Sequence, residues 1–329
     1  METIIDNRIL RKTRGDKIVS SIFLLIGFLC ASFIVIIVGF ILVKGISPFF
    51  IKYNDGSTEF SVNFINFIFG NSWNENTDLS VAYGVGFVII DTVYVTLLSL
   101  LLAVPLSVFS ALFIVRIAPR PLSIIINTCI ELLASIPSIV YGVFGMGVIN
   151  PMVNGIANSF GLQTPGGRTA LSIILVLTIM IYPTITMVSI TAIKSVKRNI
   201  IDGSLALGAS MTETNFKVVL TSAKSGIFAG IILGVGRALG EATAISLVCS
   251  PAGSGPNFNI FDSTRTLTTT MLSGIHETTG VDYDIRFSVA VVLIVIILAT
   301  NLILNQVKKR IGRLSWTWVK VKKEVVFVH

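Results

Sequence analysis

Two charged side chains, Arg237 and Glu241, occur inside an otherwise apolar segment of this 329-residue chain. Charged residues at membrane depth are costly and usually functional. Four positions apart on a helix, they would share one face and form an ion pair. A guanidinium binds the oxygens of an oxyanion through a planar fork of donors, and a nearby carboxylate would moderate that attraction. The pair therefore predicts either an anion pathway or a structural ion pair that fixes this helix against its neighbours.

The helix expected to carry this pair runs from about 225 to 250 and also contains small residues at helical spacing. In a continuous helix they would fall on the same side as Arg237. Small residues at four-residue spacing let helix backbones approach closely in a bilayer. The residues concerned are Gly226, Gly230, Gly234 and Ala244. This face is expected to look toward other helices or a polar cavity, and not toward lipid.

A basic loop over 194–224 precedes this helix. About 30 residues exceed a simple connection between two helices. The pattern predicts a short helix over 201–210, stopped or bent near Gly208, and then a second helical run from Glu213 to Leu220. Such a loop either covers the end of the bundle or docks a partner on the same side of the membrane, with its apolar residues entering a groove on that partner.

Composition indicates a polytopic membrane protein, since 53% of residues are hydrophobic and only 13% are charged, against about 25% charged in a typical soluble domain. The net charge of +8 would suit nucleic-acid binding, but the basic residues recur at the ends of apolar spans, as membrane orientation requires.

Enzymatic, metal and redox chemistry find little support in the sequence. The three cysteines are odd in number and form no CxxC pair, so we predict no disulfide and no metal site. The two histidines lack neighbouring ligands, and no Walker A sequence is present. We therefore expect no catalytic residue, no cofactor and no nucleotide hydrolysis by this chain, and a polytopic membrane enzyme is disfavoured.

An all-α polytopic fold with six transmembrane helices is expected, each helix long enough to cross a hydrocarbon core of about 30 Å. Basic residues concentrate in alternate connections, which places both termini in the cytoplasm. Residues 1–17 form a basic N-terminal segment, 18–307 the transmembrane domain, and 308–329 a basic tail. The tail is either solvated or anchored at the membrane surface by Trp316 and Trp318. The expected spans are 18–43, 84–115, 122–149, 170–193, 225–250 and 285–307.

A second intramembrane carboxylate, Glu131, belongs to the third expected span. It lies about a third of the way along that span. Two placements are open: the side chain lines the protein interior, or it faces the inner membrane interface.

The basic loop resembles the signature of ABC importer permeases, a Glu-Ala-Ala segment followed by a glycine and a later Leu-Pro. Asp202-Gly203-Ser204 stands where Glu-Ala-Ala is usual, Gly208 matches the glycine, and Leu220-Thr221 replaces Leu-Pro. The segments 131–145 and 234–244 are similar to third-span and fifth-span signatures of phosphate-specific permeases. This likeness extends to about residue 313, and the long loop 44–82 looks more like the PstC-type subunit than its PstA-type partner.

The resemblance implies a type I ABC importer permease in a bacterial inner membrane. It implies a heterodimer with a PstA-like permease, two PstB-like ATPase subunits that hydrolyse the ATP, and a PstS-like phosphate-binding protein outside. Arg237 and Glu241 match the family's pathway charges. The ATPase-coupling residues that the resemblance implies are Asp202, Gly203, Ser204, Ala206, Leu207 and Gly208.

Two other transport functions stay open at this point. The first keeps the ABC architecture but carries another oxyanion or small solute, such as molybdate or sulfate. The second is an ion-coupled secondary transporter, a class that often shows internal repeats and intramembrane acidic residues. No clear repeat occurs here, and an independent carrier would not need the long 194–224 loop.

Overall fold

The computed structural model describes residues 2–54, 59–74 and 78–326, with side chains described between 16 and 310 in those ranges. The basic residues of the first turns and the tail tryptophans, Trp316 and Trp318, therefore lie outside the described side chains. The helix α13 nevertheless continues as backbone to Val326.

Six helical segments of the described chain are long and apolar enough to cross a membrane, which confirms the predicted all-α, six-span fold. Three of them run as near-continuous helices: α1 (Glu2–Ile46), α7 (Ala170–Lys194) and α13 (Val281–Val326). The helix α3 (Gly86–Leu112) ends in a π-helical turn, η2 (Phe113–Ile117). The fifth span is built from α9 (Met211–Glu213), the π-helix η4 (Thr214–Val219) and α10 (Leu220–Gly240).

The third span differs from the expected single helix over 122–149. The helix α4 (Arg120–Ser135) ends before Pro137, and the chain continues as α5 (Ser138–Phe144), the π-helix η3 (Gly145–Ile149) and α6 (Asn150–Ser159). Proline forces the residue before it out of the helical region, and Ile136 is extended, with φ −66° and ψ 128°. By contrast, Pro105 and Pro183 lie inside α3 and α7 without ending them.

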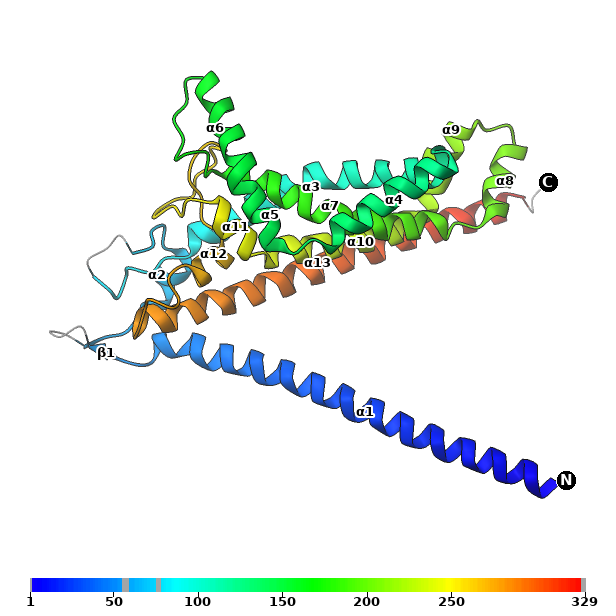
Figure 1. Ribbon diagram of the computed structural model, residues 1–329, viewed down its shortest axis with the longest axis horizontal. Helices are drawn as coiled ribbons and strands as arrows, with labels where there is room; N and C mark the ends of the chain where they lie inside the picture. The colour runs from blue at the N-terminus through cyan, green and yellow to red at the C-terminus, as the bar shows by residue number, and fades with distance from the viewer. Residues whose placement is uncertain (1, 55–58, 75–77, 327–329) are drawn as a thin grey trace.

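Shorter elements connect the spans. At one end of the molecule lie η1 (Ser47–Phe49), the hairpin strands β1 (Tyr53–Asn54) and β2 (Glu59–Phe60), α2 (Phe64–Phe69), α11 (Thr243–Val248) and α12 (Leu267–Leu272). At the other end lie α8 (Arg198–Ala206), α9, the start of α1 and the end of α13 (Figure 1). We call this second end the α8 end. The start and finish of the chain thus share one side, as an even number of spans requires.

The helix α7 forms the centre of the bundle, with α3 and α10 packed against it. The predicted glycine face makes this approach possible, since an added Cβ at Gly226 would lie 2.5 Å from Cβ of Ala192. At Gly234 an added Cβ would lie 2.8 Å from Cδ1 of Ile185. The prediction of close packing through these glycines is confirmed.

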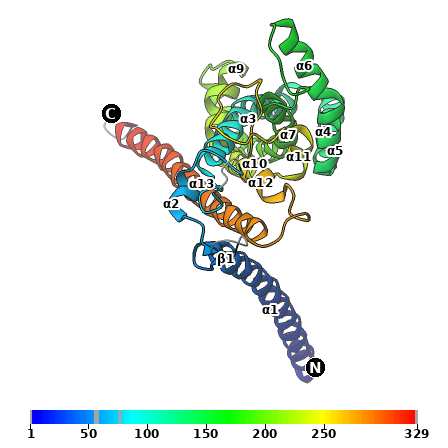
Figure 2. The ribbon, with the colours of Figure 1, turned by 90° about the vertical axis from the view of Figure 1, so that its left-hand side faces the viewer.

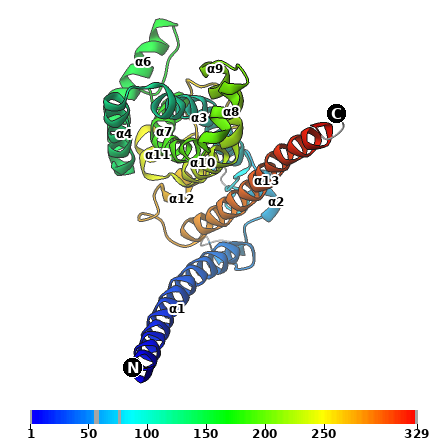
Figure 3. The same cartoon turned by 90° about the vertical axis from the view of Figure 1, so that its right-hand side faces the viewer.

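The helix α1 stands apart from this bundle. Figures 2 and 3 show it diverging from the other helices toward the α8 end. Its chief contact is with α13 at the opposite end, where Lys44 Nζ lies 3.1 Å from Asp284 Oδ1 and Ser288 Oγ donates to the Gly45 carbonyl at 2.6 Å. Beyond this junction the apolar side chains of α1 are exposed, as in Phe23, which is 70% exposed.

Candidate functional site

The short helix α8 has one buried side and one exposed side. Ile201 is 7% exposed and Leu205 is partly buried, and both pack into a cluster with residues of α7 and α10. Four positions separate these two residues, so one side of α8 faces the bundle. The other side presents Asp202, Gly203 and Ala206, and it ends in Leu207, which is 90% exposed. This side of α8 is therefore not covered by the rest of the described chain.

Gly208 ends α8 in a left-handed turn, with φ +84°. The amide of Gly208 donates to the carbonyl of Leu205 at 2.9 Å, and the amide of Ala209 donates to the carbonyl of Ser204 at 3.2 Å. This pair of bonds is the Schellman arrangement, which satisfies the last carbonyls of a helix and favours glycine at the left-handed position. No heavy atom lies within 4 Å of an added Cβ at Gly208, so backbone conformation alone requires glycine here.

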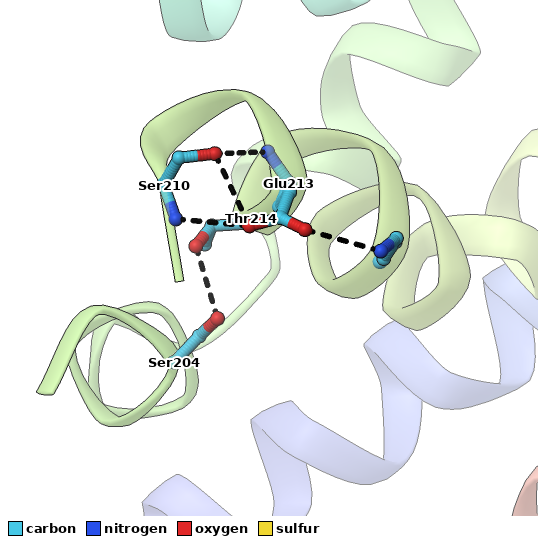
Figure 4. Close-up of polar contacts among 5 residues, drawn as sticks. Ser204, Ser210, Glu213 and Thr214 are labelled. Carbon is cyan, nitrogen blue, oxygen red and sulfur yellow. Dashed lines mark hydrogen bonds and ion pairs between the residues drawn. The ribbon is translucent and has the colours of Figure 1, made fainter. Parts of the chain in front are cut away.

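Polar contacts attach α8 to the start of the fifth span (Figure 4). The hydroxyls of Ser204 and Thr214 lie 2.9 Å apart. Ser210 and Glu213 form a reciprocal cap, in which the amide of Glu213 donates to Ser210 Oγ at 3.2 Å and the amide of Ser210 donates to Glu213 Oε2 at 3.3 Å. Lys217 Nζ lies 3.2 Å from Glu213 Oε1. These contacts join α8 to α9 and η4.

The π-helix η4 also connects this unit to the second span, because Arg116 Nε donates to Asn215 Oδ1 at 3.0 Å. Arg116 itself belongs to the π-helical end of α3. Two π-helical turns thus meet at the α8 end, and such turns are frequent at functional sites. Movement of α8 can reach two different spans through them.

All six residues that the sequence assigns to coupling lie on α8 or its terminal turn, at the α8 end of the molecule. The expected helix over 201–210 is observed over Arg198–Ala206, and the turn occurs at Gly208 as predicted. The expected run from Glu213 to Leu220 is helical and leads into α10 without interruption, but η4 has π geometry.

Arg237 lies in the last turn of α10, partly buried, and its Nη1 donates to Thr184 Oγ1 of α7 at 3.0 Å. Its charge also interacts with the phenol of Tyr141 on α5. The Tyr141 hydroxyl in turn donates to the carbonyl of Leu133 on α4 at 2.6 Å. The guanidinium therefore lies at the contact of α10 with α7, near enough to α5 for its charge to act on the Tyr141 phenol.

The predicted ion pair between Arg237 and Glu241 is absent among the described ion pairs. The helix ends at Gly240, and Glu241 has an extended backbone with ψ 123°. Glu241 Oε1 accepts a bond from the amide of Ala244 at 3.0 Å, while its carbonyl accepts a bond from Thr268 Oγ1 at 2.8 Å. The expectation of one helix through 250 is wrong, because the chain breaks between the two charges and the carboxylate caps α11.

The same break moves Ala244 off the glycine face. It lies on α11, where its Cα would be 2.9 Å from a Cβ added at Gly142 of α5. The predicted position of Ala244 beside Arg237 is therefore corrected, and its small side chain serves a different helix contact. Arg237 consequently carries no carboxylate partner within the described structure, so its donors suit an anion.

Sequence reasoning missed a buried carboxylate, Asp91 of α3, which is 0% exposed. Its Oδ2 accepts a bond from Thr264 Oγ1 at 3.1 Å, and its Oδ1 accepts one from the Asn257 amide at 3.4 Å. It thus holds the 251–266 connection against the bundle. The signal was present in the sequence as a single acidic residue within an apolar run. No group of three metal-ligating side chains occurs in the described part of the chain.

Comparison with known proteins relates this architecture to transport permeases. Residues 103–314 match the family described as binding-protein-dependent transport system inner membrane component. A probable ABC transporter permease protein, YqgH of Bacillus subtilis, is 33% identical over 92% of this chain and 93% of its own. The phosphate transport system permease protein PstC of Pasteurella multocida is 29% identical over 77% of this chain and 84% of its own.

Solved structures show the same fold at low sequence identity. A chain of a bacterial ABC transporter involved in the import of the acidic polysaccharide alginate aligns with a TM-score of 0.59. It is 17% identical, and the alignment covers 90% of this chain and 99% of that one. A second structure of an alginate ABC transporter, in complex with its pentasaccharide-bound periplasmic protein, also aligns with a TM-score of 0.59, at 17% identity over 88% of this chain and 95% of that one.

Proposed function

The chain belongs to the family of binding-protein-dependent transport system inner membrane components, and on that premise we propose that it is the PstC-like permease of an ATP-driven phosphate importer. It is a multi-pass transport permease of an ABC importer and not an enzyme. The phosphate assignment is supported by relatives named as phosphate transport permeases. The ATP used for transport would be hydrolysed by separate ATPase subunits.

The observation that carries the coupling role is the exposed side of α8, with Leu207 90% exposed on a helix anchored by Ile201. In this proposal α8 docks into a groove on a PstB-like ATPase. Asp202, Gly203, Ser204, Ala206 and Leu207 provide the contact surface, and Gly208 sets the turn that presents it. Contacts from Ser204 and Arg116 to the fifth span then carry ATPase movement into the membrane.

Arg237 is proposed to contact the anion during its passage. A guanidinium at membrane depth is little screened and presents several donors to phosphate oxygens. One of them donates to Thr184 Oγ1. Glu241 is proposed to line the same path: in the conformation described it caps α11, and in another state of the cycle it would approach Arg237 and reduce the attraction for the departing anion.

The proposed assembly is a heterodimer with a PstA-like permease, with two PstB-like ATPases on the α8 side and a PstS-like phosphate-binding protein on the other side. Residues 1–17 and 308–329 would then be cytoplasmic, and 18–307 would form the membrane domain in a bacterial inner membrane. This orientation is supported by the basic residues that flank the α8 end.

Uptake of radiolabelled phosphate into reconstituted vesicles tests the proposal. We expect uptake that requires ATP, the cognate ATPase and the binding protein together. Unlabelled sulfate or molybdate is added as a competitor to test the cargo, since strong competition by either would assign another oxyanion. Uptake that needs neither the ATPase nor the binding protein would contradict the coupling role of α8.

A further inference from the structure

Three sides of α4 differ in exposure and chemistry, at about 100° per residue around the helix. The first side packs against the bundle through Ile126 and Ile130, the latter 2% exposed. The second side, about 100° away, is apolar and open: Ile125 is 60% exposed, Leu132 is 62% exposed, and Cys129 between them is also exposed. This second side has the chemistry of a surface in contact with acyl chains.

The third side of α4 is open and holds four polar residues, which we call the polar stripe; the apolar Ile124, 59% exposed, lies on the same side nearer the start of the helix. The polar stripe consists of Asn127, Thr128, Glu131 and Ser135, which span about 100° around the helix. Thr128, Glu131 and Ser135 are exposed, and Asn127 Nδ2 donates to Glu131 Oε1 at 2.6 Å. Glu131 has no ion-pair partner among the residues whose side chains are described. In the single chain Glu131 is open at the surface, and its two predicted placements, lining the protein interior or facing the inner membrane interface, stay predictions.

The polar stripe lies on the helix that leads into the candidate membrane span Ser138–Ser159. Glu131 lies roughly 16 Å along the helix from Arg120, at 1.5 Å per residue, and the hydrocarbon core is about 30 Å thick. Two residues further on, the Leu133 carbonyl accepts the hydroxyl of Tyr141, whose ring interacts with the charge of Arg237. The stripe therefore extends from the α8 end toward the Arg237 site, at a depth where hydrocarbon cannot solvate a carboxylate.

We propose that the polar stripe lines a water-filled segment of the translocation path between Arg237 and the α8 end. The inference rests on the proposed function, because a second permease is needed to enclose this side. Within the path, Glu131 carries the opposite sign to Arg237. This like charge lowers the affinity of the segment for an oxyanion, so an anion released by the guanidinium is not retained beside Glu131.

Neighbouring cysteines provide the test, because Cys129 lies on the apolar side one residue from Thr128 on the stripe. Both test proteins carry Cys30→Ser and Cys249→Ala. One keeps Cys129 as its only cysteine, and the other combines Cys129→Ser with Thr128→Cys. The assembled transporter is placed in inside-out vesicles and treated with a charged, membrane-impermeant thiol reagent, which reacts with the hydrated thiolate.

We expect the thiol reagent to modify the Thr128→Cys protein at least tenfold faster than the Cys129 protein. Addition of ATP and vanadate, which arrest the ATPase and close the inner side of the path, should slow the modification of the Thr128→Cys protein. Equal rates, or no reaction of either protein, would overturn the proposal. Rapid labelling of the Thr128→Cys protein at the same rate with and without ATP and vanadate would also overturn it, because the stripe would then lie at an open membrane surface.

Phosphate uptake measured in the same vesicle preparation separates this inference from the proposed function. If uptake depends on ATP but the two cysteines are labelled at equal rates, the role proposed for the polar stripe is refuted and the importer assignment stands. Absent uptake removes the importer assignment, and the contrast between the two cysteines then decides whether the stripe is hydrated. In the complete transporter, Glu131→Gln is expected to slow uptake severalfold without changing the amount of copurified ATPase; unchanged uptake would refute the role of its charge.

Discussion

Substitution of two glycines on the same helix by alanine should have opposite effects. Gly208 and Gly203 both face open space, with no atom within 4 Å of an added Cβ. Gly208 has φ +84°, where a side chain costs about 1–2 kcal/mol. Gly203 lies inside α8, where alanine favours the helix by about 0.5–1 kcal/mol. The same added methyl group therefore destabilises the docking turn at one position and stabilises its helix at the other.

The expected magnitude follows from the turn equilibrium. A strain of about 1.4 kcal/mol lowers the population of the Schellman turn about tenfold relative to its alternatives. If ATPase docking needs this turn, Gly208→Ala should reduce the affinity for the ATPase by up to about tenfold. ATP-dependent phosphate uptake at limiting ATPase should fall in proportion. Gly203 belongs to the proposed contact surface, so Gly203→Ala is compared with Gly208→Ala in thermal stability alone, which it should raise. Gly208→Asn should be milder, since asparagine adopts the left-handed region more readily than alanine.

The assay titrates the ATPase against reconstituted permease and measures both copurification and uptake. Thermal unfolding of each variant in detergent serves as the control for a general folding defect. Wild-type titration curves for Gly208→Ala would refute the reasoning. Equal losses of thermal stability in Gly208→Ala and Gly203→Ala would also refute it, because within the single chain the two sites differ in backbone conformation and not in available space.

Three further predictions concern the docking surface, the pathway and the helix packing. Leu207→Asp should abolish copurification of the ATPase without lowering the melting temperature, since the side chain is 90% exposed; retained copurification would place docking elsewhere. Arg237→Gln should reduce phosphate uptake at least tenfold while the complex still assembles, and full uptake in a normally assembled complex would remove this residue from the path. Gly226→Ala should destabilise the fold by about 1–3 kcal/mol through overpacking against Ala192. Gly236→Ala meets no atom of another helix within 4 Å and should stabilise α10 by about 0.5–1 kcal/mol, since alanine favours a helix interior. Equal melting temperatures of the two variants would contradict this account of the α7–α10 contact.

Features that depend on local pattern were predictable. The six apolar runs and the alternation of basic connections determine the number of spans and the shared side of the termini, because both follow from the cost of placing charges in hydrocarbon. The glycine spacing from Gly226 to Gly234 likewise identified a close contact, since the missing side chains leave room only for a neighbouring backbone or small residue. The Gly208 turn followed from a glycine at the end of a short helical pattern.

Features that depend on tertiary contacts were not predictable. Periodicity alone continued the fifth helix past Gly240, where the structure turns so that Glu241 caps α11 and accepts a bond from Thr268. Thr268 is 27 residues away in the chain, and no local signal reveals it. The acidic residue Asp91 stood out in its apolar run, but its partner did not, since Thr264 is 173 residues distant.

The arrangement of α1 makes this fold modular. Because α1 contacts the rest of the chain chiefly at one junction with α13, it is a peripheral helix beside a core of five spans. Changes in its length or sequence leave the packing of α7 with α3 and α10 untouched. Among the spans of this chain, α1 is therefore the one whose sequence can adapt to a new neighbour in the bilayer without compensating changes in the core.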